Sequence, residues 1–265
     1  MSTVDPHADW PDRTPLTDSA GRTVLVYSLA EDVRDGRPWA DGVWRPAGIS
    51  SETAATEGLQ QLAGHAASTS DTALVAAWQA AGAGLLRRAH VMTHDLADTG
   101  PQESGAPADL HTHRLSRAQL LRHADRIGTL MMTAYPPGHP DHRFTTVEHA
   151  VRSINLVAND EVLGPFLDVS QAAVFDHTLI GAALIVNRAG VAPDGGPWIL
   201  DIFRDPTSPA KGVGRALLLA VLTAARQAGL PSMTLVVSHS NANARALYES
   251  FGFVTHSESW TLALP

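Results

Sequence analysis

The chain has 265 residues, of which 44% are hydrophobic and 17% are charged, and its formal net charge is −8. This length and composition are typical of a folded chain with one large or two modest domains, and the acidic charge argues against nucleic acid or an anionic membrane as the main partner. The chain has no cysteine, which excludes disulfides, thiolate metal sites and a cysteine nucleophile.

The N-terminal part predicts a small α+β region with little visible chemistry. Apolar residues at helical spacing and short apolar runs indicate its elements. In chain order these are a flexible leader (residues 1–22), a strand (23–27), a loop through Arg37, Trp39 and Trp44, two helices (51–65 and 72–81) and a strand (85–92). Closely spaced Gly, Pro, Ser and Asp then predict a linker over residues 99–108. We therefore divide the chain into an N-terminal region (23–98) and a second domain (109–265).

The second domain predicts a mixed sheet with helices packed on it. Ser116 and Gln119 match a capping box at the start of a helix, which the proline-rich run after Tyr135 ends. The other elements are a strand (110–115), a helix capped at Thr145, a hairpin of two strands (170–175 and 179–186), a strand (198–203), a helix (216–228), a strand (234–238), a helix (241–250) and a last strand or pair (253–264). This order predicts an α+β (mixed α/β) fold, with antiparallel pairing at first and parallel pairing where a helix intervenes.

A glycine-bearing turn joins the strand at 198–203 to the helix that follows it. Its sequence is Lys211-Gly212-Val213-Gly214-Arg215. Glycine lets the backbone approach a ligand closely, and the first N–H groups of a helix have no partner within the helix. With the positive end of the helix dipole, this order of elements is typical of a phosphate-binding site. A plain turn has the same pattern, so the interpretation depends on the rest of the chain.

Two segments around this turn resemble the GCN5-related N-acetyltransferase (GNAT) superfamily. Residues 201–217 resemble its cofactor-binding motif, and residues 241–253 resemble its second motif, N-x-x-A-x-x-L-Y-x-x-x-G-F, at every fixed position. The resemblance covers residues 109–265 and implies a GNAT-like mixed sheet flanked by helices. The first motif departs at Pro209, where an arginine or glutamine usually contributes a donor. The resemblance therefore implies cofactor binding that is weakened or reshaped, with the helix-start amides retained.

The resemblance also implies acetyl-CoA as co-substrate and gives residues their roles. Tyr248 is implied as the general acid that returns a proton to the sulfur, with packing as its alternative, and Asp201 as the base, with a solvated or salt-bridged carboxylate as its alternative. Asn241 is a cofactor contact or only a helix N-cap, and Lys211 and Arg215 are phosphate contacts or solvated cations. The expected catalytic residues are Tyr248 and Asp201. The expected cofactor-binding residues are Ile202, Phe203, Arg204, Lys211, Gly212, Val213, Gly214, Arg215, Asn241 and Tyr248.

Five other polar residues are weaker candidates. Asp109, His111 and His113 alternate along a strand, so that one face of the strand presents all three side chains, as in a metal site. A strand with one solvent-exposed face explains the same pattern, and no metal is expected. His139 and His142 fall in the loop between the first two helices of the second domain. In the superfamily that loop often borders the acceptor site, which makes them candidates for the acceptor side.

The N-terminal region carries a faint repeat of the second motif. Residues 76–82 and the strand after them resemble the layout of residues 246–252, and Trp78 falls where Tyr248 falls. This predicts a degenerate, partial second GNAT unit without its own glycine turn. Shared helix composition is the alternative explanation.

The expected function is acetyl-CoA-dependent N-acetyl transfer, directly and without a metal, to a primary amine of a small molecule. Two alternatives stay open: acetylation of a protein N-terminus or lysine, and an acyl-CoA-binding regulatory module without turnover. P-loop hydrolysis and serine hydrolase chemistry are disfavoured because G-x-x-x-x-G-K-[ST] and G-x-S-x-G are absent. The oligomeric state stays open, with a homodimer among the alternatives. The polar N-terminus and the lack of an apolar run of ~18 residues indicate neither a signal peptide nor a membrane helix, so we expect a cytoplasmic protein.

Overall fold

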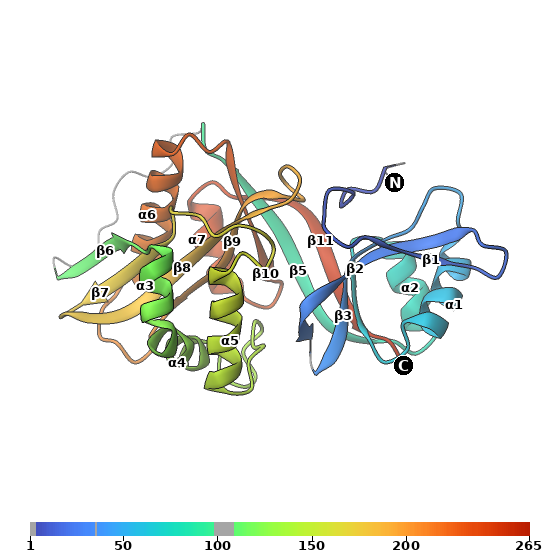
Figure 1. The fold of residues 1–265 in the computed structure, drawn as a ribbon, viewed down its shortest axis with the longest axis horizontal. Coiled ribbons are helices and arrows are strands. Elements are labelled where there is room, and N and C mark those ends of the chain that lie inside the picture. Colours follow the sequence, from blue (N-terminus) through green and yellow to red (C-terminus); the bar gives the residue numbers. More distant parts are fainter. Residues whose placement is uncertain (1–3, 35, 98–108) are drawn as a thin grey trace. The chain divides into compact units, whose positions relative to one another are not determined.

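The computed structural model describes residues 4–34, 36–97 and 109–265 of the chain (Figure 1). These residues fold into two units. The first comprises the residues up to Val91 together with Ser238–Ser240 and Thr255–Pro265, and the second comprises Met92–Val237 and Asn241–Val254. The predicted linker, residues 99–108, lies outside the described residues. Each unit therefore includes residues that precede the predicted linker and residues that follow it. Composition instead predicts a division of the chain at the linker.

The first unit contains a sheet with the strand order β1-β2-β3-β4-β11-β5. Strands β1 and β2, β2 and β3, and β4 and β11 pair antiparallel, whereas β3 and β4 pair parallel. Strand β5 begins in this unit and ends in the second. The elements are β1 (Thr14–Thr17), β2 (Thr23–Arg34), β3 (Arg37–Trp44), α1 (Ser51–Gln61), β4 (Ala66–Thr69), α2 (Thr72–Ala80), β5 (Gly84–Asp95) and β11 (Val254–Ala263).

Three parts of the first unit differ from the sequence predictions. The predicted leader, residues 1–22, contains β1, which pairs with β2. The predicted loop over residues 37–44 is strand β3, whose pattern is interrupted by Pro38 and Gly42. Residues 66–69, for which no element is predicted, form β4, and four residues are too few for a period to be recognised.

Helices α1 and α2 of the first unit begin at side-chain caps. The Ser50 hydroxyl accepts the Thr53 N–H, and the Asp71 carboxylate accepts the N–H groups of Ala73 and Leu74. Trp78 on α2 is 0% exposed and belongs to a hydrophobic core made by this unit alone. The two helices predicted here are thus confirmed.

The second unit contains a sheet with the strand order β5-β10-β9-β8-β7-β6. Its pairs are antiparallel from β6 to β9 and parallel between β9 and β10, as the element order predicts. No helix of the described residues is both long and apolar enough to span a membrane. The elements are β6 (Leu110–Arg114), α3 (Arg117–Arg122), α4 (Ala124–Ala134), α5 (Val147–Ala158), β7 (Gln171–Phe175), β8 (Thr178–Arg188), β9 (Gly196–Arg204), α6 (Val213–Gln227), β10 (Ser232–Ser238) and α7 (Ala242–Ser250).

Helices cover both faces of this sheet (Figure 1). On one face, Leu217 of α6 shares a hydrophobic core with Ala183 of β8. On β9, Phe203 lies opposite Ala182 of β8. Because the side chains of neighbouring strand residues alternate between faces, Ala182 and Phe203 point to the face opposite that of Ala183. There Phe203 contacts the ring of Tyr135, which ends α4. The predicted mixed sheet flanked by helices is confirmed.

Local signals in the second unit place the starts of α3, α5 and α7 to within a residue, whereas α6 begins at Val213, three residues before the predicted 216. The capping box at Ser116 is present, although the predicted single helix divides at His123 into α3 and α4. Helix α5 is capped by Thr146 rather than by Thr145. In the β7–β8 hairpin, Asp176 and the residue after it both have positive φ, which is the backbone of a tight turn that twists with its strands.

The element order β9-α6-β10-α7-β11 repeats the order β3-α1-β4-α2-β5 of the first unit. In each set the first two strands pair parallel over two residue pairs. Trp78 on α2 occupies the place that Tyr248 occupies on α7, and both are buried. This repeat supports the interpretation of the N-terminal region as a partial second copy.

Candidate functional site

A β-bulge interrupts strand β9 at the start of the first motif. Opposite β8, Ile199 pairs with Ile185 and Asp201 pairs with Leu184. Leu200 is therefore an extra residue on β9 without a partner on β8. A bulge of this kind bends the strand and changes where the following side chains point.

The pairing of β9 with β10 ends at the same place. Both strands are described in full, and their register pairs Trp198 with Thr234 and Ile199 with Leu235. The residues from Asp201 onwards pair with β8 but not with β10. The bulge thus leaves the second half of β9 with one edge outside the sheet pairing.

The backbone groups on that edge follow from the pairing with β8. The Asp205 N–H donates to Ile180 O at 2.7 Å, so its backbone points toward β8. Because the direction alternates along an antiparallel strand, the N–H and C=O groups of Ile202 and Arg204 point to the opposite edge. The Tyr135 hydroxyl donates to the Ile202 carbonyl there at 3.0 Å. Two backbone N–H groups, from Ile202 and Arg204, therefore face the edge that β10 leaves.

The N-terminus of α6 has no side-chain cap. The N-cap is Gly212, at φ 73°, in the left-handed region that glycine occupies without strain. A Cβ built on it would meet nothing within 4 Å. The first helical N–H group with a backbone acceptor inside the helix is that of Ala216, which donates to Gly212 O. The N–H groups of Val213, Gly214 and Arg215 precede it, which is the donor set that an anion at a helix start requires.

Two cations border this helix start. Lys211 is exposed. The Arg215 guanidinium lies over the ring of Phe251, 4.8 Å from its centroid. Arg215 is thus stacked on the second motif rather than simply solvated, and the phosphate contacts of both cations stay predictions.

Asp205 organises the loop around Pro209. Its carboxylate accepts the Thr207 N–H at 2.9 Å and the Thr207 hydroxyl at 2.6 Å. The Ser208 hydroxyl accepts the Ala210 N–H at 3.3 Å. Side chains of the loop hold its shape although Pro209 has no N–H to contribute.

Asp201 forms an ion pair with Arg143, and the two side chains are 7% and 20% exposed. Burial raises the pKa of Asp201, and the charge and hydrogen bond of Arg143 counteract part of that rise. The salt-bridged alternative is therefore what the structure contains. A base role for Asp201 stays a prediction, and the raised pKa is in the direction that favours it.

Tyr248 lies on α7 and is 7% exposed, with its ring 5.8 Å from that of Phe253. Burial raises the pKa of Tyr248, and the negative charges of Asp141 and Asp201 raise it further. Its hydroxyl therefore keeps its proton at neutral pH. Tyr248 packs helix on strand and at the same time is kept in the form that a proton donor needs.

Asn241 connects the second motif to the loop after α4. Its side-chain oxygen accepts the Ala244 N–H at 3.2 Å, which makes it the N-cap of α7. Its amide nitrogen donates to an Asp141 carboxylate oxygen at 3.0 Å. The capping alternative is thus confirmed, and a cofactor contact stays a prediction.

A family model described as the acetyltransferase (GNAT) family matches residues 124–253. The chain carries a GNAT acetyltransferase domain. Most of the GNAT domain lies in the second unit and contains the bulge, the α6 start and both motifs. The resemblance of residues 201–217 and 241–253 is thereby confirmed.

Known proteins similar to the chain extend this finding. Over 69 residues the chain is 41% identical to a mycothiol acetyltransferase of Saccharomonospora viridis, and the match spans 26% of the chain and 22% of that enzyme. A solved GCN5-related N-acetyltransferase from Sphaerobacter thermophilus has a TM-score of 0.66 at 16% identity, covering 95% of this chain and 79% of its own. A tandem GNAT protein from the clavulanic acid biosynthesis pathway has a TM-score of 0.61 at 15% identity, covering 92% and 79%. These two likenesses show the fold, and the tandem structure supports a second GNAT-like unit at the N-terminus.

The two loop histidines of the GNAT domain do reach the site. His139 Nδ1 accepts the Asp141 N–H at 3.0 Å, and its ring lies 5.1 Å from that of Tyr135. His142 Nδ1 lies 2.7 Å from the Tyr135 carbonyl oxygen. Both histidines therefore pack on residues next to Asp201. The other pair of histidines predicted from sequence lies on β6, at the far edge of this unit's sheet.

Sequence reasoning missed three residues of the GNAT site: Tyr135, Asp141 and Arg143. All three lie in or beside the proline-rich loop after α4, where the sequence indicates only that a helix ends. Tyr135 is half-buried, and desolvation together with the charge of Asp201 raises its pKa well above the usual value. The one signal in the sequence is that a tyrosine, an aspartate and an arginine occur within nine residues of this loop. The sequence does not indicate which residues they contact.

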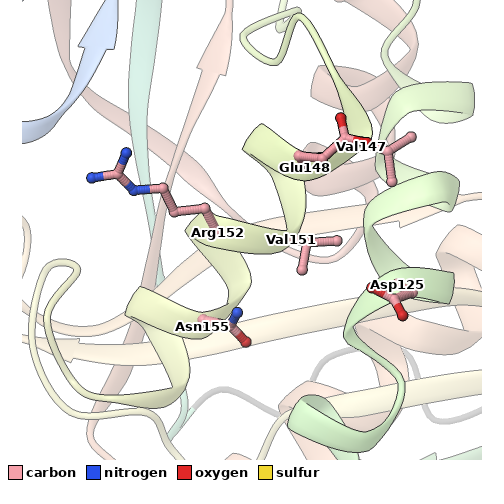
Figure 2. Close-up of a pocket in the computed structure, with 6 residues that line it drawn as sticks. All are labelled: Asp125, Val147, Glu148, Val151, Arg152 and Asn155. Carbon is pink, nitrogen blue, oxygen red and sulfur yellow. The ribbon is translucent and has the colours of Figure 1, made fainter.

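A separate groove lies between helices α4 and α5 of the GNAT domain. Its volume is about 310 Å³, and none of the predicted site residues lines it. Figure 2 shows Val147 and Val151 facing α4, where Asp125 lies, whereas Arg152 points away from that helix. The lining residues are Asp125, Val147, Glu148, Val151, Arg152 and Asn155.

Proposed function

We propose that the GNAT domain transfers an acetyl group from acetyl-CoA to a primary amine of a small molecule, directly and without a covalent enzyme intermediate. One observation carries the proposal. The β9 bulge ends the pairing with β10, and the chain then runs from an open strand edge to an uncapped helix start within a few residues. Along the chain, backbone N–H groups are therefore available first for an extended chain that bears amide groups and then for a phosphate.

The residues present fit such a donor. The N–H groups of Val213, Gly214 and Arg215, with the exposed Lys211, suit a pyrophosphate. The N–H groups of Ile202 and Arg204 suit the carbonyl groups of the extended arm and of the thioester. Acetyl-CoA supplies, when bound, an acetyl group activated as a thioester.

Two side chains suit the proton transfers. Asp201 accepts the proton of the attacking amine, directly or through a water molecule, and the pKa raised by burial makes it a stronger base than an exposed aspartate. Tyr248 donates a proton to the leaving sulfur, because its raised pKa keeps the hydroxyl protonated until the thiolate forms. Arg143 counteracts part of the rise of the Asp201 pKa and so favours the ionised carboxylate.

The acceptor side supports an amine that arrives as a cation. Asp141 and Asp201 bring two carboxylates to one place, and both contribute to the raised pKa of Tyr248. The similar Saccharomonospora enzyme is named for mycothiol, which favours a small-molecule acceptor over a protein. Acetylation of a protein N-terminus or lysine, and donor binding without turnover, are the alternative functions.

A free-thiol release assay on the full chain tests this proposal, and the absence of cysteine removes the protein's own background. Acetyl-CoA is supplied with a panel of polyamines, amino sugars, amino acids, a lysine peptide and an N-terminal peptide. We expect thiol release with at least one small amine and loss of that release in Tyr248→Phe. Release with peptides alone indicates the protein-acetylating alternative, and a melting shift with acetyl-CoA but no release indicates a binding module. No acetyl-CoA binding at all refutes the proposal.

A further inference from the structure

Three side chains with metal-binding groups meet in the first unit, outside the GNAT donor site. His90 lies on β5, His239 directly follows β10, and Glu258 lies on β11. All three belong to the first unit. One ligand atom of each lies within 4.8 Å of the others. The sequence does not predict this group, because 149 residues separate the two histidines.

The two imidazoles face each other through nitrogen atoms. His90 Nε2 lies 2.9 Å from His239 Nδ1, and the ring centroids are 5.1 Å apart. Two ligands at ~2.0 Å from a tetrahedral ion lie roughly 3.3 Å apart, so small side-chain rotations admit an ion. Glu258 Oε1 lies 3.7 Å from Nδ1, the other ring nitrogen of His90. One ion takes only one of these two nitrogens, and one ligand atom from each of the three residues still lies within 4.8 Å of the others.

Arg88 holds two of these three groups in place. Its carbonyl oxygen accepts the His239 N–H at 2.8 Å. Its guanidinium donates to Glu258 Oε1 at 2.8 Å and to Oε2 at 2.9 Å. Hydrogen bonds of this kind commonly orient ligand carboxylates, and Oε1, which accepts one of them, keeps a lone pair for an ion. His90 is buried and His239 is exposed, so the cluster is anchored on one side and open to solvent on the other.

We propose that His90, His239 and Glu258 bind a divalent transition-metal ion. Two imidazoles and one carboxylate are the ligand set of many zinc sites, with a fourth position left to water, and they disfavour magnesium and calcium, which prefer oxygen ligands. The ligands come from three separate segments of the first unit. An ion held by all three therefore stabilises that unit. The positive guanidinium of Arg88 opposes the ion and sets a moderate affinity.

Zinc binding is measured by calorimetry on the full chain without a polyhistidine tag, after treatment with a chelator. We expect one zinc ion per chain, and a melting temperature raised by at least ~2 °C in excess ZnCl₂ but not in MgCl₂. His239→Gln, at an exposed position, should weaken zinc binding at least tenfold, since a lost ligand costs at least as much as a lost orienting partner. His111→Gln is the matched control, because it also removes an exposed histidine with a histidine neighbour, 6.3 Å away between ring centroids.

A second pair of variants separates ligation from simple structural support. Glu258→Gln should weaken zinc binding more than Arg88→Gln does, because the first removes a ligand charge, whereas the second removes an orienting donor together with a repelling charge. Both variants break the same ion pair, so a purely structural effect lowers both affinities equally. A larger loss in Glu258→Gln supports the site. Equal zinc binding in wild type and His239→Gln, equal losses in the pair, or no binding at 100 µM ZnCl₂ overturns it.

Discussion

The carboxylate of Asp201 and the guanidinium of Arg143 form an ion pair beside the β9 bulge, and both side chains are largely withdrawn from water. Burial disfavours the charged carboxylate more than the guanidinium stabilises it, so the pKa of Asp201 is raised. A carboxylate in this balance gains a proton more readily than an exposed aspartate does. That is the requirement for a general base in amine acetylation.

The first prediction concerns pH. Because the pKa of Asp201 is raised, kcat/KM should rise with pH through a value above the usual 3.8 of aspartate. Asp201→Asn should remove this acidic limb and lower kcat/KM about 10²-fold. The measurement is a pH profile with one acceptor amine for both proteins, so that the amine's own ionisation is common to both. An unchanged acidic limb in Asp201→Asn assigns it to another group.

The same shift has a consequence for stability. A carboxyl group with a raised pKa in the folded state stabilises the fold when protonated. That contribution is complete below the pKa of the unfolded chain and is lost as pH rises through the folded value. Asp201 therefore contributes less to stability at pH values above its folded pKa than at values below the unfolded one.

Tyr248→Phe tests the proton donor. The hydroxyl is lost while the buried ring and its contact with Phe253 stay, so kcat should fall at least tenfold with little change in KM for acetyl-CoA. Steady-state kinetics over both substrates gives this separation. Tyr27→Phe, in the core of the first unit, is the control and should leave kcat unchanged. If Tyr248→Phe behaves like the control, Tyr248 only packs.

Tyr135→Phe should act on stability. Its hydroxyl donates to the Ile202 carbonyl at 3.0 Å, and removal of this donor from a half-buried place should lower the free energy of unfolding by about 1 kcal/mol. Urea unfolding of the full chain, monitored through the second unit, measures the change. A free energy equal to that of the wild type would mean that water replaces the hydroxyl at Ile202.

Two glycines at opposite ends of α6 separate ligand binding from backbone strain. Gly212 has φ 73° and Gly229 has φ 70°, and a Cβ at either meets nothing within 4 Å. Alanine at each position should therefore cost roughly 1 kcal/mol of folding free energy. Only Gly212→Ala, at the helix start, should also raise KM for acetyl-CoA. Equal KM values in the two variants would remove the α6 start from the donor site.

Local chemistry made much of the second unit predictable. The glycine turn before α6, the cap at Asn241 and the Asp176 turn each depend on residues next to one another in the chain, so the sequence displays them. Strand β3 was missed because proline and glycine interrupt its pattern, although its pairing with β2 tolerates both. Arg143 and Tyr135 were missed because their partners, Asp201 and Ile202, are 58 and 67 residues away. A loop residue gives no sign of such a partner.

The antiparallel pairing of β11 with β4 joins Ala263 to Ala66. During synthesis the N-terminal residues leave the ribosome first, yet β4 receives this neighbour only after β11, almost 200 residues later in the chain, has emerged. Until then one edge of β4 is open to unwanted pairing with other chains. Emergence of Val254–Ala263, rather than translation of the first hundred residues, therefore sets the moment at which β4 gains this neighbour.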